Sequence, residues 1–352
     1  MGLVQALMSE GHTVTAIAPK DEYTHYLEEA GCDYQEITMD SRGANAIKDL
    51  GLIFELFGIY RKVKPDVILQ YTIKPNIYGT LAASLLGIPT VNNVCGLGTA
   101  FLNKGLVSRI AIGMYKLAFR FPKLIYFQNN DDKIFFEENN IIKNNPTKVL
   151  PGSGINLSHF KPAEETQNKK FTFLLISRLI HDKGIIEYID AIKYLKEKGV
   201  NANFQILGNK DFEHRRGISE DIINSWIDSN VVEYLGSTDD VRPFINNADC
   251  VVLPSYREGT PKSLLEAASS AKPIIATNVA GCTNIVTDDV NGMLCKVKDH
   301  KDLADKLEAM SNLPKERLAQ MGKESRKIVE KRFDEKIVID SYLNTISSFQ
   351  NS

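Results

Sequence analysis

Residues 248–281 constrain the fold of this chain more than any other stretch. Residues 250–254 (CVVLP) are apolar and β-branched, which is typical of a short buried strand. Thr260 and Pro261 then predict a helix start, with threonine at the N-cap and proline at the first helical position, where no amide proton is needed. Residues 273–277 predict the next strand. The pattern is a βαβ unit, so we expect an α/β fold with a parallel sheet.

The loop and helix start of this unit are suited to an anion that also carries hydroxyl groups. Glu258 lies in the loop and Glu266 lies about two turns into the helix. Free amides at a helix N-terminus bind phosphate oxygens, and carboxylates accept hydrogen bonds from hydroxyls such as those of a sugar or a ribose. The candidate anion-binding residues between the two carboxylates are Gly259, Thr260, Pro261, Lys262 and Ser263. The alternative is an ordinary helix start with acidic residues in its first turns.

A second loop places two cations after a predicted strand. Residues 171–176 form an uninterrupted apolar run, and Arg178 and Lys183 follow it, five positions apart and close to a helix start. Ligands of open parallel sheets bind at the carboxyl ends of the strands, so these side chains are candidates for neutralising a bound anion. The alternative role is in surface salt bridges.

Residues 248–267, ADCVVLPSYREGTPKSLLEA, resemble the Glu-x7-Glu signature of the retaining, nucleotide-sugar-dependent glycosyltransferases of family 4. The resemblance implies the GT-B fold, in which two Rossmann-like domains face each other across a cleft. It also implies that Glu258 contacts hydroxyls of the transferred sugar and that Glu266 holds the ribose. By the same resemblance Arg178 and Lys183 neutralise the nucleotide diphosphate, and the catalytic residues are Glu258, Arg178 and Lys183.

The length of 352 residues is comfortable for two domains. We expect an acceptor-binding Rossmann-like domain at 1–155, a nucleotide-sugar-binding one at 156–334, and a helix at 335–352 that returns to the first domain. The first domain lacks the strand and glycine loop with which such a domain opens, because residues 2–9 already predict the end of a helix. Its loss would expose the edges of neighbouring strands. A start placed too late explains this better than a damaged copy, since everything downstream looks intact.

Two segments of the first domain resemble the branch of the family that extends polyprenyl-diphosphate-linked sugars in bacterial capsule, O-antigen and glycan assembly. They are residues 74–79 (KPNIYG), predicted as an irregular segment after a strand, and residues 96–98 (GLG). The resemblance implies an acceptor site at Lys74, Asn76, Gly96, Leu97 and Gly98. Lys74 could instead be a solvated loop lysine.

The charge pattern of the first domain favours a membrane surface. No acidic residue occurs between Asp66 and Asp131. If residues 106–120 are helical, three basic residues lie on one stripe with apolar residues beside them, which suits a membrane interface and an anionic lipid diphosphate. The predicted membrane-facing residues are Lys104, Arg109, Lys116 and Arg120. We therefore expect a cytoplasmic protein, peripheral on the inner face of the cell membrane. The alternative is a buried apolar face opposite a solvated charged one.

Composition excludes several other classes. A net charge of −2 argues against nucleic acid as a partner. Five scattered cysteines indicate a reducing compartment without a zinc site, and no apolar run of about 18 residues is present to span a membrane. No Asp-x-Asp pair stands where a divalent metal would be held, so we expect a UDP-sugar as co-substrate and no cofactor.

The sequence therefore predicts a hexosyltransferase. It would move a sugar, by resemblance an N-acetylhexosamine, from a UDP-sugar to a lipid-diphosphate-linked saccharide with retention of configuration. Two alternatives remain at this point. One is a related enzyme on the same scaffold, such as a UDP-sugar 2-epimerase or an inverting transferase. The other is a non-catalytic remnant that still binds nucleotide sugar.

Overall fold

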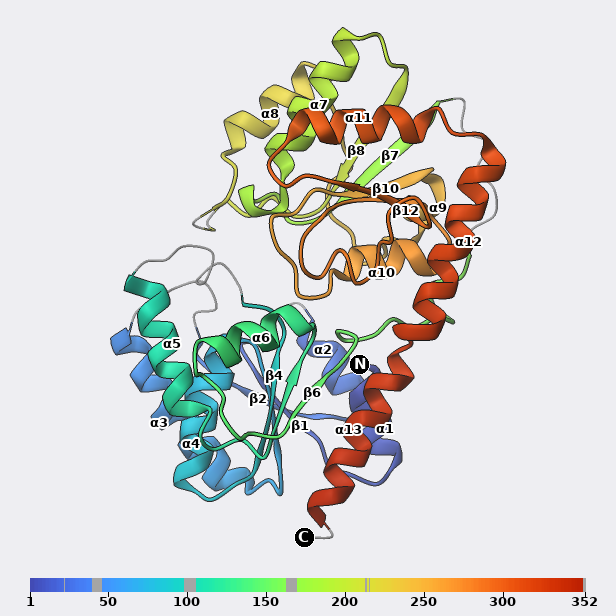
Figure 1. Cartoon of the computed structure of the whole chain (residues 1–352). Helices are drawn as coiled ribbons and strands as arrows, with labels where there is room; N and C mark the ends of the chain where they lie inside the picture. Colours follow the sequence, from blue (N-terminus) through green and yellow to red (C-terminus); the bar gives the residue numbers. More distant parts are fainter. Residues whose placement is uncertain are drawn as a thin grey trace. The chain divides into compact units, whose positions relative to one another are not determined.

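The computed structural model describes residues 1–21, 23–39, 46–97, 106–162, 170–212, 214 and 216–350. The chain divides into two compact units (Figure 1). Unit 1 comprises Met1–Ser153 and Glu335–Ser352, and unit 2 comprises Gly154–Asp334. Gly98, predicted to bind the acceptor, and Lys104, predicted to face a membrane, lie outside the described residues.

The described strands of unit 2 form a six-stranded parallel sheet in the order β12-β11-β10-β7-β8-β9. Its strands are β7 (Phe171–Ile176), β8 (Ala202–Leu207), β9 (Glu233–Tyr234), β10 (Cys250–Leu253), β11 (Ile274–Thr277) and β12 (Gly292–Cys295). The first strand of the unit, β7, lies between β10 and β8. The strand order therefore reverses at β7, and such a reversal opens a crevice at the carboxyl ends of the strands.

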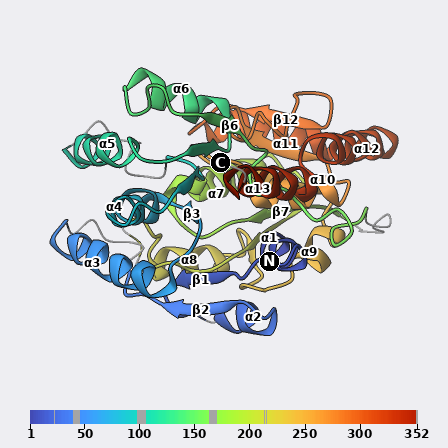
Figure 2. The ribbon, with the colours of Figure 1, turned by 90° about the horizontal axis from the view of Figure 1, so that it is seen from below.

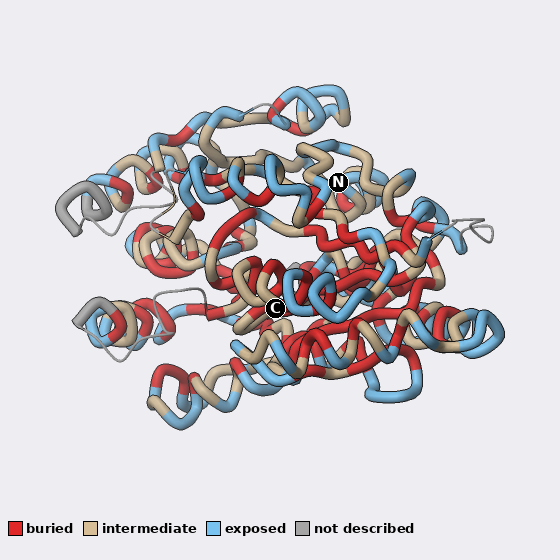
Figure 3. The backbone as a smooth tube through the Cα atoms, turned by 90° about the horizontal axis from the view of Figure 1, so that it is seen from above, coloured by how far each residue is buried: buried red, intermediate tan, exposed pale blue. Residues whose placement is uncertain are grey.

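Helices cover both faces of this sheet. They are η3 (His181–Lys183), α7 (Ile185–Glu197), α8 (Glu220–Asp228), α9 (Arg242–Asn247), α10 (Lys262–Ser269), α11 (His300–Ser311) and α12 (Lys315–Arg332). Phe173 and Leu175 of β7 pack in the core that contains α7 and α11 residues. Leu174 and Ile176 pack in the opposite core with α10. A central parallel strand is covered on both sides, which explains its uninterrupted apolar sequence. Figure 3 colours the backbone by burial, with buried residues in red.

Helix α10 begins later than its sequence predicted. Its first residue is Lys262, and Pro261 occupies the N-cap with φ −70° and ψ 116°. The prediction of Thr260 as N-cap and Pro261 as first helical residue was wrong by one position, because the proline keeps an extended ψ. No side chain caps this helix start.

The described strands of unit 1 form two separate sheets. One pairs β1 (Thr15–Ala18) with β2 (Asp33–Glu36), and the other has the order β3-β4-β5-β6. The strands of the second sheet are β3 (Ile68–Tyr71), β4 (Thr90–Val94), β5 (Leu124–Phe127) and β6 (Thr147–Val149). Within the described residues no ladder joins β1 to β3, so an edge of each sheet stays unpaired.

The helices of unit 1 lie on both faces of the four-stranded sheet. They are α1 (Gly2–Ser9), α2 (Thr24–Glu29), α3 (Ala46–Val63), η1 (Pro75–Gly79), α4 (Thr80–Leu85), α5 (Leu106–Ala118), α6 (Asn130–Glu138) and α13 (Glu335–Gln350). Helices α3, α4 and α5 stand side by side (Figures 1 and 2). On the other face Tyr126 of β5 donates a hydrogen bond to the Ser341 carbonyl of α13 over 2.9 Å. Helix α13 thus packs on the first unit.

Candidate active site

The candidate site lies at the carboxyl ends of β7 and β10, which are adjacent parallel strands. Lys183 ends the short helix η3 after β7, and Glu258 lies in the loop after β10. Because the two strands are neighbours, their loops meet: Lys183 Nζ is 2.5 Å from Glu258 Oε1. The side chains are 23% and 11% exposed. Two of the three predicted catalytic residues therefore form an ion pair that solvent reaches only in part.

Two glycines let the loops around this pair approach closely. Gly184 has φ +72°, and a Cβ there would lie 2.0 Å from the Pro254 carbonyl oxygen. Gly281 has φ +84°, and a Cβ there would lie 2.6 Å from the Glu258 carbonyl oxygen. Any other residue at either position would push the loops apart. Neither glycine was singled out from the sequence. The position of each one at the end of a predicted loop could have indicated that a close backbone approach requires glycine there.

Arg178, the third predicted catalytic residue, pairs with a carboxylate that the sequence did not reveal. Its Nη1 lies 3.3 Å from Asp211 Oδ2. The Asp211 side chain is 6% exposed, whereas that of Arg178 is 55% exposed. The nearly buried Asp211 thus holds the arginine by an ion pair, while the guanidinium remains exposed to solvent. The two residues are 33 positions apart, and no local pattern marks Asp211.

The predicted anion-binding segment lies at the open start of α10. Lys262 is exposed, and Gly259, Thr260 and Ser263 are half-buried, whereas Pro261 is buried. Without a side-chain cap, the first amides of α10 point outward at the positive end of the helix dipole. The segment has the polarity that an anion requires.

Glu266 is buried inside α10, with the Lys262 ammonium 3.8 Å away. Burial raises the pKa of its carboxyl group to about 7, and Lys262 opposes this increase only in part. The charged form of Glu266 is therefore disfavoured without a ligand. A group that donates hydrogen bonds to the carboxylate would stabilise it.

The raised pKa predicts a pH-dependent cost in stability. Between the ordinary pKa of about 4.5 and the folded-state pKa of about 7, the unfolded chain ionises first, so the unfolding free energy falls as pH rises. Glu266→Gln removes this cost. The variant should gain stability relative to the wild type from pH 5 to pH 8, by on the order of 3 kcal/mol at most.

Chemical denaturation at a series of pH values measures this difference. Glu316→Gln, which changes an exposed residue of α12 in the same way, is the control. A stability gain in Glu266→Gln that does not change with pH would contradict the assignment.

The predicted acceptor residues of unit 1 divide into accessible and buried ones. Lys74 and Gly96 are half-buried, and Gly96 adopts φ +132° just after β4. Asn76 is fully buried, and its side-chain amide donates to the Asn93 carbonyl over 2.8 Å. Leu97 is 2% exposed and belongs to the hydrophobic core. The side chains of Asn76 and Leu97 therefore lie below the surface, and their role in acceptor binding stays a prediction. The irregular segment is the π-helix η1, which turns Asn76 inward toward Asn93 of β4.

The described part of the predicted membrane-facing surface is exposed. Arg109 and Lys116 lie on α5, but this helix ends at Ala118, so Arg120 follows it in a turn and is not on a helical stripe as predicted. Three large apolar residues are exposed beside these basic ones: Ile110 at 55%, Leu117 at 44% and Phe121 at 47%. Apolar side chains at this exposure are not core residues. We call Arg109, Ile110, Lys116, Leu117, Arg120 and Phe121 the α5 surface.

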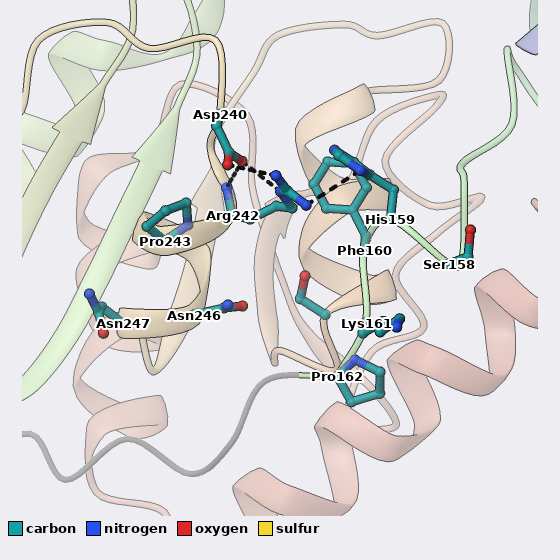
Figure 4. Close-up of a pocket in the computed structure, with 11 residues that line it drawn as sticks. Ser158, His159, Phe160, Lys161, Pro162, Asp240, Arg242, Pro243, Asn246 and Asn247 are labelled. Carbon is teal, nitrogen blue, oxygen red and sulfur yellow. Dashed lines mark hydrogen bonds and ion pairs between the residues drawn. The ribbon is translucent and has the colours of Figure 1, made fainter.

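A cavity of about 710 Å³ lies elsewhere in unit 2, between residues 158–162 and α9 (Figure 4). There Arg242 Nε and Nη2 donate to the two oxygens of Asp240, over 2.7 and 2.8 Å. The guanidinium lowers the pKa of Asp240 to about 2. The cavity is lined by none of the residues predicted to bind the donor. The loops after β7 and β10 are the better candidate site.

The residues that the structure describes contain no group of three His, Cys, Asp or Glu side chains placed to hold a metal ion. Over the same residues, no helix combines the length and the apolar character that crossing a membrane requires.

Comparison with protein-family models matches both units. Residues 1–129 match the model described as "Glycosyl transferase 4-like", and residues 158–328 match "Glycosyl transferases group 1". Among curated proteins, the chain is 31% identical to the N,N'-diacetylbacillosaminyl-diphospho-undecaprenol alpha-1,3-N-acetylgalactosaminyltransferase of Campylobacter jejuni, over 97% of this chain and 93% of the relative. It is 27% identical to the UDP-Gal:alpha-D-GlcNAc-diphosphoundecaprenol alpha-1,3-galactosyltransferase of Escherichia coli, over 78% and 74% of the two chains.

Solved structures show the same fold at lower sequence identity. HepE from Anabaena in complex with UDP matches with a TM-score of 0.77 and 18% identity, over 96% of this chain and all of that one. Sucrose-phosphate synthase from Thermosynechococcus elongatus matches with a TM-score of 0.84 and 17% identity, over 100% and 92% of the two chains. These likenesses confirm the predicted fold, with Rossmann-like units of the GT-B type.

Proposed function

Since the chain belongs to the glycosyltransferases of group 1 and family 4, we propose that it transfers an N-acetylhexosamine from a UDP-sugar to a saccharide linked to a polyprenyl diphosphate. The observation that carries this proposal is the convergence of Lys183 and Glu258 at the edge of the unit 2 sheet. The acceptor class follows the Campylobacter and Escherichia coli relatives, whose names specify sugars on diphospho-undecaprenol.

The donor would lie along the loops after β7 and β10. Its diphosphate would meet Arg178, Lys183 and the first amides of α10, which are sources of positive potential on the loops at the carboxyl ends of these strands. The ribose hydroxyls would donate to Glu266, and this would favour the charged form that burial disfavours. Glu258 would accept hydrogen bonds from the sugar and is already oriented by Lys183.

During transfer the bond between the anomeric carbon and the diphosphate oxygen breaks, and its electron pair stays on the departing diphosphate. Preorganised cations stabilise that negative charge. The acceptor hydroxyl bonds to the anomeric carbon on the face from which the diphosphate departs, and its proton passes to the diphosphate. Configuration is thereby retained without a covalent sugar–enzyme intermediate. With the charge met by side chains and amides, we expect no divalent metal to be needed.

The α5 surface would hold the enzyme against the anionic cytoplasmic face of the membrane, where a lipid-linked acceptor resides. Basic side chains near such a surface contribute about 1 kcal/mol each, and exposed apolar ones insert among the headgroups. The α5 surface combines both kinds of residue.

Reversing the charge of Arg109, Lys116 and Arg120 to glutamate should therefore weaken sedimentation with phosphatidylglycerol-containing vesicles by at least tenfold. The same reversal at Lys315, Lys323 and Lys331, which are exposed on α12, is the matched control and should have a smaller effect. Equal effects of the two triple variants would show that the attraction to vesicles is non-specific. Unchanged vesicle binding of the α5 variant would refute the membrane role of the α5 surface.

A transfer assay tests the proposal as a whole. Purified protein is incubated with UDP-N-acetylgalactosamine or UDP-N-acetylglucosamine and a polyprenyl-diphosphate-linked monosaccharide, with and without EDTA. We expect an extended lipid-linked product and equal rates with the chelator. Binding of UDP-sugar without turnover would favour the non-catalytic remnant, and formation of an epimerised UDP-sugar would favour the epimerase. A strict requirement for magnesium would refute the metal-free account.

A further inference from the structure

Tyr256 is held by three segments of unit 2 that are distant in sequence. Its hydroxyl donates to Glu187 Oε1, in the first turn of α7, over 2.7 Å. Its backbone amide donates to the Asp182 carbonyl oxygen over 2.9 Å. The Lys298 ammonium lies 4.6 Å from the centre of its ring. A tyrosine in an exposed loop needs none of these contacts, so their convergence calls for a physical reason.

Two of the three contacts, those with Glu187 and Asp182, join the loop of Glu258 to the loop of Lys183, whereas Lys298 comes from the segment after β12. Tyr256 precedes Glu258 by two residues, and Asp182 directly precedes Lys183. Glu187 lies in the first turn of the helix that follows Lys183. The contacts of Tyr256 with Asp182 and Glu187 therefore limit how far the two loops can separate, and these loops carry the Lys183–Glu258 ion pair at 2.5 Å.

Lys298 adopts an unusual backbone conformation at this point. Its φ of +58° lies in the left-handed region, which residues with a side chain rarely occupy. That conformation accompanies the placement of its ammonium over the Tyr256 ring. A cation over an aromatic face is attracted to the electron-rich ring. The ring is thus held on its face by a cation and at its hydroxyl by an anion.

We propose that Tyr256 is a positioning residue that fixes Glu258 for sugar transfer, acting through Glu187 and Lys298. This inference rests on the proposed function and extends it to residues that would not touch the donor. Tyr256 orients the carboxylate that contacts the sugar, whereas Arg178 keeps a separate support, the Asp211 carboxylate. Loss of the clamp should therefore affect the sugar more than the diphosphate.

The hydroxyl of Tyr256 remains a donor at every pH used for assay. Burial raises its pKa well above the usual range, and the Glu187 carboxylate beside it adds to the increase. Loss of the hydroxyl should consequently lower kcat by the same factor at every pH and leave the shape of the pH profile unchanged.

Tyr256→Phe removes the hydroxyl and keeps the ring. It should lower kcat by tenfold or more, because a misplacement of about 1 Å costs up to a hundredfold. The Kd for UDP should stay within twofold of the wild-type value. The ratio of the affinity for UDP-N-acetylhexosamine to the affinity for UDP should decrease. Tm should fall by no more than about 3 °C, since only one hydrogen bond is lost.

Companion variants separate positioning from folding. Glu187→Gln keeps an acceptor oxygen and should restore most of the rate lost in Glu187→Ala. Lys298→Asn suits the left-handed backbone but removes the cation, and should lower kcat by a smaller factor. Tyr194→Phe is the matched control, because Tyr194 also carries a lysine over its ring, Lys198, outside the site.

If Tyr256→Phe has the same kcat and the same sugar selectivity as the wild type, the inference is overturned and the proposed function is unaffected. A parallel loss of UDP binding and Tm would also overturn it, by showing a purely structural role. A wild-type protein without turnover would refute the proposed function, and the ratio of UDP-sugar to UDP affinity would still test the clamp.

Discussion

Replacing Glu258 with glutamine should lower kcat for sugar transfer by a hundredfold or more. The substitution keeps the size of the side chain but removes the charge that accepts hydrogen bonds from the sugar and pairs with Lys183 at 2.5 Å. Losing one preorganised electrostatic partner in an active site commonly costs two to three orders of magnitude in rate. Gly281 approaches the backbone carbonyl of Glu258, which the substitution leaves in place, so the fold should be preserved.

The rate is measured with saturating UDP-sugar and acceptor, and binding of UDP is measured separately by calorimetry. UDP affinity should change little or increase, since Lys183 loses its competing carboxylate. Glu330→Gln, on the exposed side of α12, serves as the control for a carboxylate change outside the site. A rate within threefold of wild type would refute the role of Glu258.

Removing the guanidinium in Arg178→Ala should reduce kcat/KM by a hundredfold or more and weaken UDP binding. Arg178 is the more exposed of the two cations, and its anchored position over the nearly buried Asp211 leaves its outer face open to a diphosphate. The departing diphosphate gains negative charge in the transition state, so losing this cation should affect the rate more than the binding.

Two companion variants test whether the charge or the ion pair matters. Arg178→Lys keeps a cation but not the fork that binds phosphate oxygens in pairs, and should recover part of the rate. Asp211→Asn keeps Arg178 and removes its anchor, and should retain more than a tenth of the activity. Equal losses in Arg178→Ala and Asp211→Asn would show that the pair supports the loop and does not bind the diphosphate.

Much of the candidate donor site could be predicted from the sequence because its residues follow local patterns. Strand 171–176 was predicted with its observed ends, and the strand before Glu258 within one residue. The carboxyl end of a parallel strand is a defined place, so Arg178, Lys183 and Glu258 could be assigned to one edge of a sheet before any coordinates were known. Glu266 was placed about two turns into the helix from the sequence, its ribose-binding role was implied by the family resemblance, and the structure adds that it is buried.

Unit 1 was harder to predict. The segment after β3 has no hydrophobic period, and it forms a π-helix that turns Asn76 into the interior. The sequence marked the α5 surface correctly as basic and apolar, but it could not show that the helix ends before Arg120.

The sequence by itself determined the fold class, the family and the loops that carry the charged residues, because strand and helix periods and motif spacing are local properties. The tertiary structure alone decided which side chains meet. Asp211 reaches Arg178 across 33 residues, and Glu187 reaches Tyr256 across 69. These contacts depend on β7 lying between β10 and β8. That strand order is set by how the strands pack together, and it cannot be predicted from a segment shorter than the whole unit.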